Sequence, residues 1–237
     1  MDQKELNWPE GTKILVILAH PDDPEFFMGA TIACWTKAGY QVQYGLLTDG
    51  ERGVSSAYPD YHVLPSIRHI EQKNAAAKLG VHQIDYFGYP DGYLTPSIEI
   101  RKRIASFIRK VQPQIVVGSD PTMLLSRGRY LNHPDHRAAG QIVVDSIFPA
   151  VGNPSFFPEL MDEGLMPWQV KELWLCLTNE PDVHMHVDEY WDKRYKALCE
   201  HKSQIGDPET LLKKLTERRN SLTEPYCEGF RRIIFGG

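Results

Sequence analysis

The chain has 237 residues, of which 42% are hydrophobic and 24% are charged, and its formal net charge is −5. This length and composition are typical of a globular protein with one substantial core, and they exclude disorder as the main state. The acidic balance, together with the lack of a Lys/Arg stripe, argues against nucleic acid as a partner.

Apolar β-like runs alternate with helical periodicity over the first two-thirds of the chain. In chain order, the expected elements are a strand at Lys13–Ala19, a helix at Phe26–Ala38, a strand at Gln41–Thr48, a helix at Ser66–Leu79, a strand at Gln83–Phe87, a helix at Ile98–Val111, a strand at Ile115–Val117 and a helix at His133–Ile147. Strands and helices that alternate with short connections indicate an α/β fold. The pattern therefore predicts a Rossmann-like, mostly parallel sheet with helices on both faces.

The last third of the chain is more irregular and is interrupted by prolines. Its expected elements are strands at Glu172–Leu177 and His184–Val187 and helices at Asp188–His201 and Pro208–Leu222. We expect a single domain over residues 1–237, in which residues 1–150 form the Rossmann-like core. Residues 151–237 are expected to pack on that core as a lid or subdomain.

Cysteines, apolar runs and the amino terminus indicate where the protein works. The four cysteines are dispersed and form no C-x-x-C pair, so buried free thiols are expected and any metal should take N and O ligands. The longest apolar run, Ile14–Ala19, is too short to span a membrane, and the first residues lack the layout of a secretory signal. We therefore expect a cytoplasmic protein; a homo-oligomer is compatible with the sequence.

Two distant segments share a His-Pro-Asp pattern. The first, H-P-D-D-P-E at His20–Glu25, directly follows the first strand, and the second, N-H-P-D-H-R at Asn132–Arg137, follows the loop after Ile115–Val117. The carboxyl ends of parallel strands lie at one edge of a sheet, so the two segments are expected to meet there. Catalytic zinc takes three ligands from His and Asp/Glu and leaves a position for water. The sequence therefore predicts a zinc site with spare carboxylates for acid–base work.

The candidate residues of this site are His20, Asp22, Asp23, His133, Asp135 and His136. His133 and His136 are three residues apart at a helix start, so both can face one site, whereas Asp135 points elsewhere and can accept a hydrogen bond from an imidazole. Asp22 and Asp23 diverge, so one can bind the metal while the other faces its water; the spacing leaves open which. Helix capping explains each aspartate singly, but the joint pattern favours a metal site.

The segments A-H-P-D-D-P-E and H-P-D-H-R-A-A-G together resemble the LmbE-like/PIG-L family of zinc-dependent N-acetylglucosaminyl deacetylases. Weaker similarities are T-D-G-E-R-G from Thr48, R-x-x-E at Arg68 and Glu71, P-D-G at Pro90 and H-K-S-Q at His201. The likeness extends from Lys13 to Phe230. The segment Phe26–Met28 departs from the family pattern, in which smaller residues are common, and helix packing is the interpretation we prefer.

The resemblance implies a ligand set and a base. His20, Asp23 and His136 would bind Zn²⁺, with Fe²⁺ as the alternative metal whose use depends on availability. Asp22 would be the general base that activates water. These roles come from the resemblance and not from the spacing of the residues.

The resemblance also implies further catalytic and binding roles. His133 would be a protonated imidazole that stabilises the oxyanion or protonates the leaving amine, and Asp135 would orient it. Arg68 and Asp91 fall where family members contact the sugar. The expected substrate is a small-molecule N-acetylated sugar or glycoconjugate, which would yield acetate and a free amine.

Three other functions compete with this interpretation. A zinc hydrolase of a different N-acyl amide and a non-catalytic metal-binding relative both keep the metal site. A dinucleotide-binding module requires G-x-G-x-x-G after the first strand, whereas this chain has Asp22, Asp23 and Glu25 there, which would repel phosphate. The sequence therefore excludes the dinucleotide module.

Overall fold

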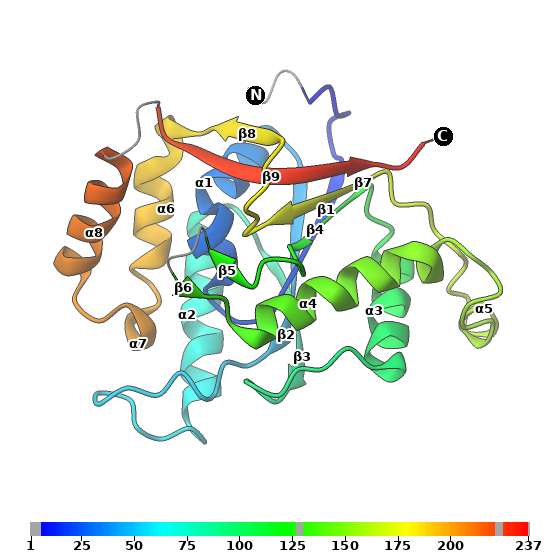
Figure 1. Cartoon of the computed structure of the whole chain (residues 1–237), viewed down its shortest axis with the longest axis horizontal. Coiled ribbons are helices and arrows are strands. Elements are labelled where there is room, and N and C mark those ends of the chain that lie inside the picture. Colours follow the sequence, from blue (N-terminus) through cyan, green and yellow to red (C-terminus); the bar gives the residue numbers. More distant parts are fainter. Residues whose placement is uncertain (1–5, 127–129, 221–224, 237) are drawn as a thin grey trace.

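A computed structural model describes residues 6–126, 130–220 and 225–236 of the chain (Figure 1). Its main sheet has seven strands in the order β3-β2-β1-β4-β7-β9-β8. The strands are β1 (Lys13–Leu18), β2 (Gln41–Thr48), β3 (Gln83–Tyr89), β4 (Ile115–Ser119), β7 (Glu172–Cys176), β8 (Val183–His186) and β9 (Cys227–Ile234). The five neighbouring strands β3, β2, β1, β4 and β7 are parallel, and β9 runs antiparallel to both β7 and β8. The predicted mostly parallel sheet is confirmed.

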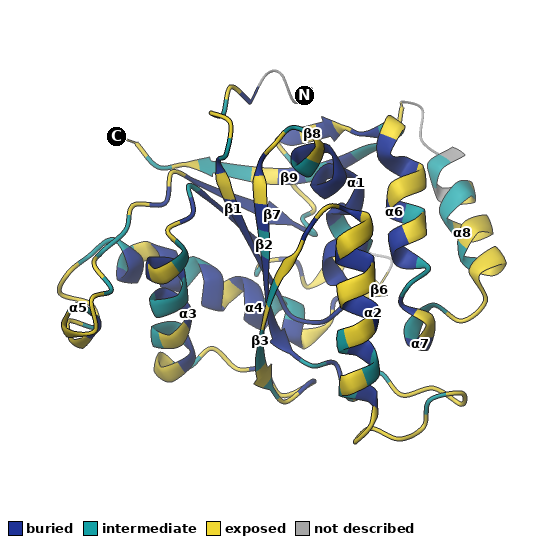
Figure 2. Cartoon of the chain, turned by 180° about the vertical axis from the view of Figure 1, so that it is seen from behind, coloured by how far each residue is buried: buried dark blue, intermediate teal, exposed yellow. Residues whose placement is uncertain are grey.

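Helices cover both faces of the sheet, and its central strands β1, β4 and β7 are buried between them (Figure 2). The longer helices are α1 (Asp23–Lys37), α2 (Leu64–Lys78), α3 (Ile98–Val111), α4 (Pro134–Asp145), α6 (Trp191–Leu198) and α8 (Pro208–Asn220). Side chains of β1 alternate between two cores: Ile14 and Val16 pack with α1 and α2, whereas Leu15 and Ile17 pack with α3 and α4. This alternation explains why the strand is a continuous apolar run.

Short elements connect the longer ones. They are β5 (Leu125–Ser126), β6 (Tyr130–Leu131), the π-helix η2 (Ser146–Val151), α5 (Glu159–Asp162), the 3₁₀-helix η3 (Asp188–Tyr190) and α7 (Lys202–Ile205). None of the helices in the described part of the chain has the length and apolarity that a bilayer span requires.

The strand order reverses beside β1. From β1 the chain moves to β2 and β3 on one side, whereas β4 and β7 lie on the other. Such a switch point opens a crevice at the carboxyl ends of the two central strands, where ligands bind in open α/β sheets. The segments after β1 and β4 both begin at this edge of the sheet.

The observed bounds match two of the predicted ranges and differ from the others at one or both ends. The predicted bounds of β2 and α3 are confirmed. The helix expected from Phe26 begins at Asp23, with Pro24 at a first-turn position that needs no N–H. The helix expected to reach Ile147 ends at Asp145 and continues as η2. The last two residues of the helix expected to end at Leu222 lie outside the described residues.

The last third of the chain extends the sheet. β9, which lies outside every predicted strand, pairs with β7 on one side and with β8 on the other, and so adds β8 to the main sheet. α6 packs against α1 and α2, on the flank that also carries α7 and α8 (Figure 1). The residues beyond 150 therefore contribute both strands and helix cover.

Candidate metal centre

The two His-Pro-Asp segments lie together at the carboxyl edge of the sheet. His20 follows β1 after a single residue, and Asp23 begins α1. His133 is the N-cap of α4 and accepts a hydrogen bond from the backbone N of Asp135, which fixes the helix start. His136 lies in the first turn of α4, so the helix presents it toward the crevice between β1 and β4.

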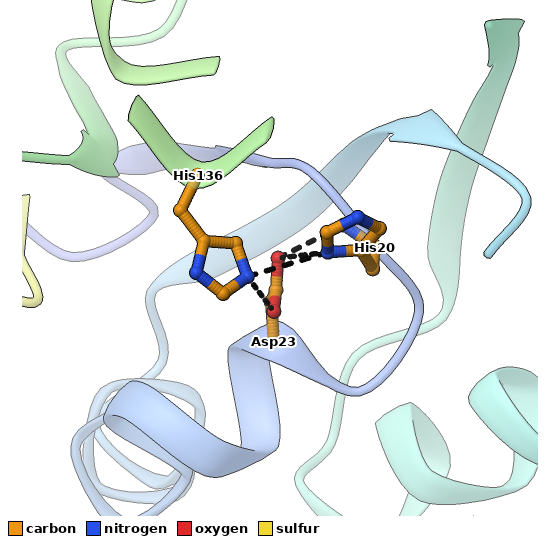
Figure 3. Close-up of side chains that lie close together, drawn as sticks. All are labelled: His20, Asp23 and His136. Atoms are coloured by element: carbon orange, nitrogen blue, oxygen red, sulfur yellow. Dashed lines mark hydrogen bonds and ion pairs between the residues drawn. The ribbon is translucent and has the colours of Figure 1, made fainter. Parts of the chain in front are cut away.

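Three side chains direct donor atoms to one point, as Figure 3 shows for His20, Asp23 and His136. His20 Nδ1 lies 3.3 Å from His136 Nε2 and 3.5 Å from Asp23 Oδ2. His136 Nε2 lies 3.0 Å from Asp23 Oδ1. Ligand atoms bound tetrahedrally to zinc at about 2.0–2.2 Å are about 3.3–3.6 Å from one another. The spacing and the N/O donor set therefore fit such an ion.

Both histidines also contact acceptors through their other ring nitrogen. His20 Nε2 lies 3.0 Å from Asp91 Oδ1 and 3.4 Å from Asp135 Oδ2. His136 Nδ1 lies 3.0 Å from Asn132 Oδ1. An acceptor on the outer nitrogen places the ring proton there and leaves the lone pair of the inner nitrogen for a cation. The surrounding residues thus prepare both rings as ligands.

Charge in the site also favours a cation. Burial opposes ionisation of Asp23, but His136 and His20 hold the pKa of this carboxyl far below its usual range. Burial likewise opposes ionisation of Asp91 and Asp135, yet the neighbouring His20 helps to lower the pKa of both carboxyls. Asp23 therefore lies ionised at the inner nitrogens, and Asp91 and Asp135 lie ionised behind His20, so a divalent cation at the inner nitrogens offsets negative charge.

Asp22 lies between the first two ligands in the chain and has a strained backbone. Its φ of 91° and ψ of −29° lie in the left-handed region, which costs a residue other than glycine about 1–3 kcal/mol. Gln72 Oε1 accepts a 2.7 Å hydrogen bond from the Asp22 backbone N, and Arg68 Nη2 donates to Asp22 Oδ2 at 3.0 Å. Burial raises the pKa of Asp22, although Arg68 opposes this shift. The carboxylate is therefore fixed in place and is more basic than an exposed aspartate.

Arg68 and Asp91, which we predicted to contact the sugar, are both buried and bonded to the chain itself. Arg68 donates to the carbonyl oxygen of Gly50 at 2.7 Å and to that of Pro21. Asp91 Oδ2 accepts from the backbone N of Arg52 at 3.1 Å, while Oδ1 faces the first ligand histidine. The contact of these two residues with a sugar stays a prediction.

The contacts of His133 favour a neutral ring, whereas the resemblance implies a protonated one. The Asp135 carboxylate accepts from the backbone N of Gly92 at 2.6 Å and of Leu94 at 3.2 Å and lies against His20. Its backbone N, not its carboxylate, donates to His133 Nδ1 at 3.2 Å. A ring nitrogen that accepts carries no proton, so this contact requires His133 to be neutral with its proton on Nε2. Burial and the neighbouring His20 also lower the pKa of His133, and the part of this residue in the reaction stays a prediction.

The sequence analysis assigned no role to several residues that support the site. Asn132 is the first residue of the N-H-P-D-H-R segment, and its place directly before the two histidines was the signal that could have identified it. Gln72 had no local signal, because its bond to Asp22 joins residues 50 positions apart. Phe27, in the segment that departs from the family pattern, packs edge-on against His136 with ring centroids 5.2 Å apart. That residue therefore contacts a ligand as well as filling space.

The fold and the site together define an α/β protein with a candidate metal centre at the switch point of its sheet. The PIG-L family, described as GlcNAc-PI de-N-acetylase, matches residues 15–147, which is more than half of the chain. The chain belongs to the PIG-L family. The family predicted from the two His-Pro-Asp segments is thus confirmed.

Individual relatives are similar over most of the chain. It is 34% identical to a diacetylchitobiose deacetylase of Thermococcus kodakarensis, over 93% of this chain and 83% of the relative. It is 29% identical to a probable N-acetyl-alpha-D-glucosaminyl L-malate deacetylase 2 of Bacillus anthracis, over 89% and 88% of the two chains. The solved N,N'-diacetylchitobiose deacetylase of Pyrococcus horikoshii, in complex with its inhibitor MPG, superposes with a TM-score of 0.84 at 31% identity. That match covers 94% of this chain and 84% of the other.

Proposed function

We propose that this protein is a zinc-dependent N-deacetylase that hydrolyses the acetamide of an N-acetylglucosamine-type sugar to acetate and a free amine. The observation that carries the proposal is the convergence of His20, Asp23 and His136 beside the half-buried carboxylate of Asp22. The similarity to deacetylases of N-acetylated sugars supports the reaction and the substrate class. Fe²⁺ is the alternative metal, since availability in the cell decides between divalent ions.

The chain supplies the base and its orientation. Bound zinc contributes Lewis acidity, which makes a water acidic near neutral pH and polarises a carbonyl. Asp22 Oδ2 accepts from Arg68, so Oδ1 is the oxygen that takes up the proton of the attacking water. The raised pKa of Asp22 favours this uptake, and the proton is then available for the leaving amine.

His133 is the proposed donor to the developing oxyanion. Because its Nδ1 accepts from the backbone of Asp135, the neutral ring offers its Nε2–H. A preorganised donor of this kind typically contributes about 10²–10³ in rate. A neutral imidazole also avoids placing a second cation beside the metal.

The test combines metal analysis with acetate release. The purified protein is incubated with N-acetylglucosamine, N,N'-diacetylchitobiose and an N-acetylglucosaminyl malate, with and without a chelator, and acetate is measured. We expect acetate from at least one sugar, loss of activity with the chelator and recovery with Zn²⁺ or Fe²⁺. Bound metal without acetate from any of these sugars would contradict the proposal. Activity on other N-acyl amides alone would then favour a different amide hydrolase, and no hydrolysis at all would favour a metal-binding relative.

A further inference from the structure

The H-K-S-Q segment at residues 201–204 has no role in the reaction above, yet it bonds to the segments around the base. His201 Nε2 contacts a carboxylate at 3.2 Å, Ser203 donates to a second one through its backbone N at 2.8 Å and its Oγ at 2.7 Å, and Gln204 Nε2 donates to a backbone carbonyl at 2.9 Å. Their partners are Glu25 in α1, Glu71 in α2 and Gly53 in the loop after β2. One short segment thus ties together three elements that surround Asp22.

A continuous hydrogen-bonded chain runs from His201 to Asp22. Glu25 accepts from His201 Nε2 at 3.2 Å and from Gln72 Nε2 at 3.0 and 3.1 Å, and Gln72 Oε1 accepts from the backbone N of Asp22 at 2.7 Å. His201, Glu25 and Gln72 are each 0% exposed. These side chains are out of contact with bulk solvent, so each bond is strong and each member of the chain helps to fix the next.

The chemistry of the groups determines which end of the Gln72 amide faces Glu25 and which end faces Asp22. Both carboxylate oxygens of Glu25 lie within hydrogen-bond distance of Gln72 Nε2, so they accept from the NH₂ of the Gln72 amide. The amide oxygen of Gln72 is then the atom that faces Asp22, whose backbone N–H it receives. Loss of the carboxylate therefore removes the reason for this amide orientation, and loss of the His201 donor removes a bond that holds the carboxylate in place.

The last hydrogen bond of this series, from the backbone N of Asp22 to Gln72, involves the residue with the strained backbone. The left-handed φ of Asp22, 91°, persists only if its surroundings hold it. The Gln72 bond holds the peptide N–H of Asp22, and the Arg68 bond holds its carboxylate. If the N–H is released, the backbone can relax and carry the carboxylate away from the attacking water.

We propose that His201, acting through Glu25 and Gln72, is a positioning residue that keeps the Asp22 base in its strained, catalytically competent conformation. The proposal rests on the proposed function, since it assigns a task to residues behind the base of that reaction. His201 and Glu25 touch neither metal ligands nor substrate in this account. Their effect should therefore appear in the rate of the chemical step and not in metal content or substrate affinity.

A matched pair of substitutions tests this role. Glu25→Gln and Glu172→Gln each replace a buried carboxylate that accepts from three side chains, but Glu172 lies at the opposite end of the sheet and bonds to Trp8, Trp174 and Arg232. We expect Glu25→Gln to lower the single-turnover deacetylation rate about 10–100-fold, because displacement of a catalytic group by about 1 Å costs about 10²-fold. KM and metal stoichiometry should stay unchanged. Glu172→Gln should keep the wild-type rate.

A second pair separates the donor from the bulk of the ring. His201→Leu fills similar space without a donor and should lower the rate as Glu25→Gln does, whereas His201→Gln keeps an N–H donor and should restore most of it. The idea fails if folded, metal-loaded His201→Leu and Glu25→Gln both turn over within about threefold of wild type. It also fails if their rate loss follows loss of metal.

Amide hydrogen exchange gives a readout that does not depend on activity. Exchange at the Asp22 amide should accelerate in His201→Leu and Glu25→Gln and not in Glu172→Gln, since only the first two loosen the Gln72 acceptor. A wild-type protein that releases no acetate would defeat the proposed function but leave this comparison intact. Unchanged Asp22 exchange in an active enzyme would defeat the positioning role alone.

Discussion

Asn132 should control metal affinity without touching the metal. It is 1% exposed, its Oδ1 lies 3.0 Å from His136 Nδ1, and its Nδ2 donates to the Met123 carbonyl at 2.8 Å. In Asn132→Leu, the metal-binding tautomer of His136 leaves its Nδ1–H without an acceptor. An unsatisfied buried donor costs about 1–3 kcal/mol, and loss of such outer partners weakens metal binding about 10–100-fold.

The assay is a chelator-competition titration with Zn²⁺ on the metal-free protein. Kd should rise about 10–100-fold in Asn132→Leu, which corresponds to about 1.4–2.8 kcal/mol. Asn132→Asp keeps an oxygen acceptor for His136 and is the matched control, with Kd expected within about fivefold of wild type. A folded Asn132→Leu with wild-type Kd would refute the reasoning.

Three further predictions concern the base and two remote buried groups. Asp22→Asn should keep full metal occupancy but lose about 10²–10⁴ in kcat, measured as acetate release; wild-type turnover would remove the base assignment. Burial opposes ionisation of Glu172, but bonds from Arg232 and two tryptophans lower its pKa below the ordinary 4.5, so its stabilisation is present above that pH and is lost as pH falls further. The Tm of Glu172→Gln should therefore fall less steeply than that of the wild type as the pH is lowered from 5 to 3, and an equal fall in Tm for both proteins would contradict this. Arg109, which is 1% exposed, donates to the backbone carbonyls of five residues that lie at the end of η2 and in the segments before and after α5. Arg109→Lys should lower the free energy of unfolding in urea by about 2–4 kcal/mol, and a loss below about 0.5 kcal/mol would show that these bonds add little.

Local patterns were sufficient for the parallel half of the sheet. Strands such as Gln41–Thr48 are buried on both faces, so they appear as apolar runs, and α3 has one strongly apolar side that marks its length. The sequence of β9, C-E-G-F-R-R-I-I, does not have the pattern that predicts a strand. It places Glu228 in the interior and arginines between apolar residues. Glu228 is buried because its carboxylate accepts from the backbone N of Ala30 and Thr31, a contact that only the tertiary fold supplies.

The candidate site was predictable to the extent that it is local. His20, Asp23 and His136 lie in two short motifs at strand and helix ends, and the topology of a parallel sheet brings such ends together. The outer contacts depend on which side chains the fold places behind the ligands. The bond of His201 to Glu25 joins residues 176 positions apart, and the local sequence around neither residue predicts this contact.

The most direct test of the account is a calorimetric titration of the metal-free protein with Zn²⁺, carried out on wild type and on His136→Ala. If His20, Asp23 and His136 hold a single ion, the wild-type protein binds one zinc per chain, and the variant loses that site while its fold, followed by circular dichroism, is retained. A wild-type chain that binds no zinc, or a variant that binds it with unchanged affinity, would contradict the metal centre and the reaction proposed for it.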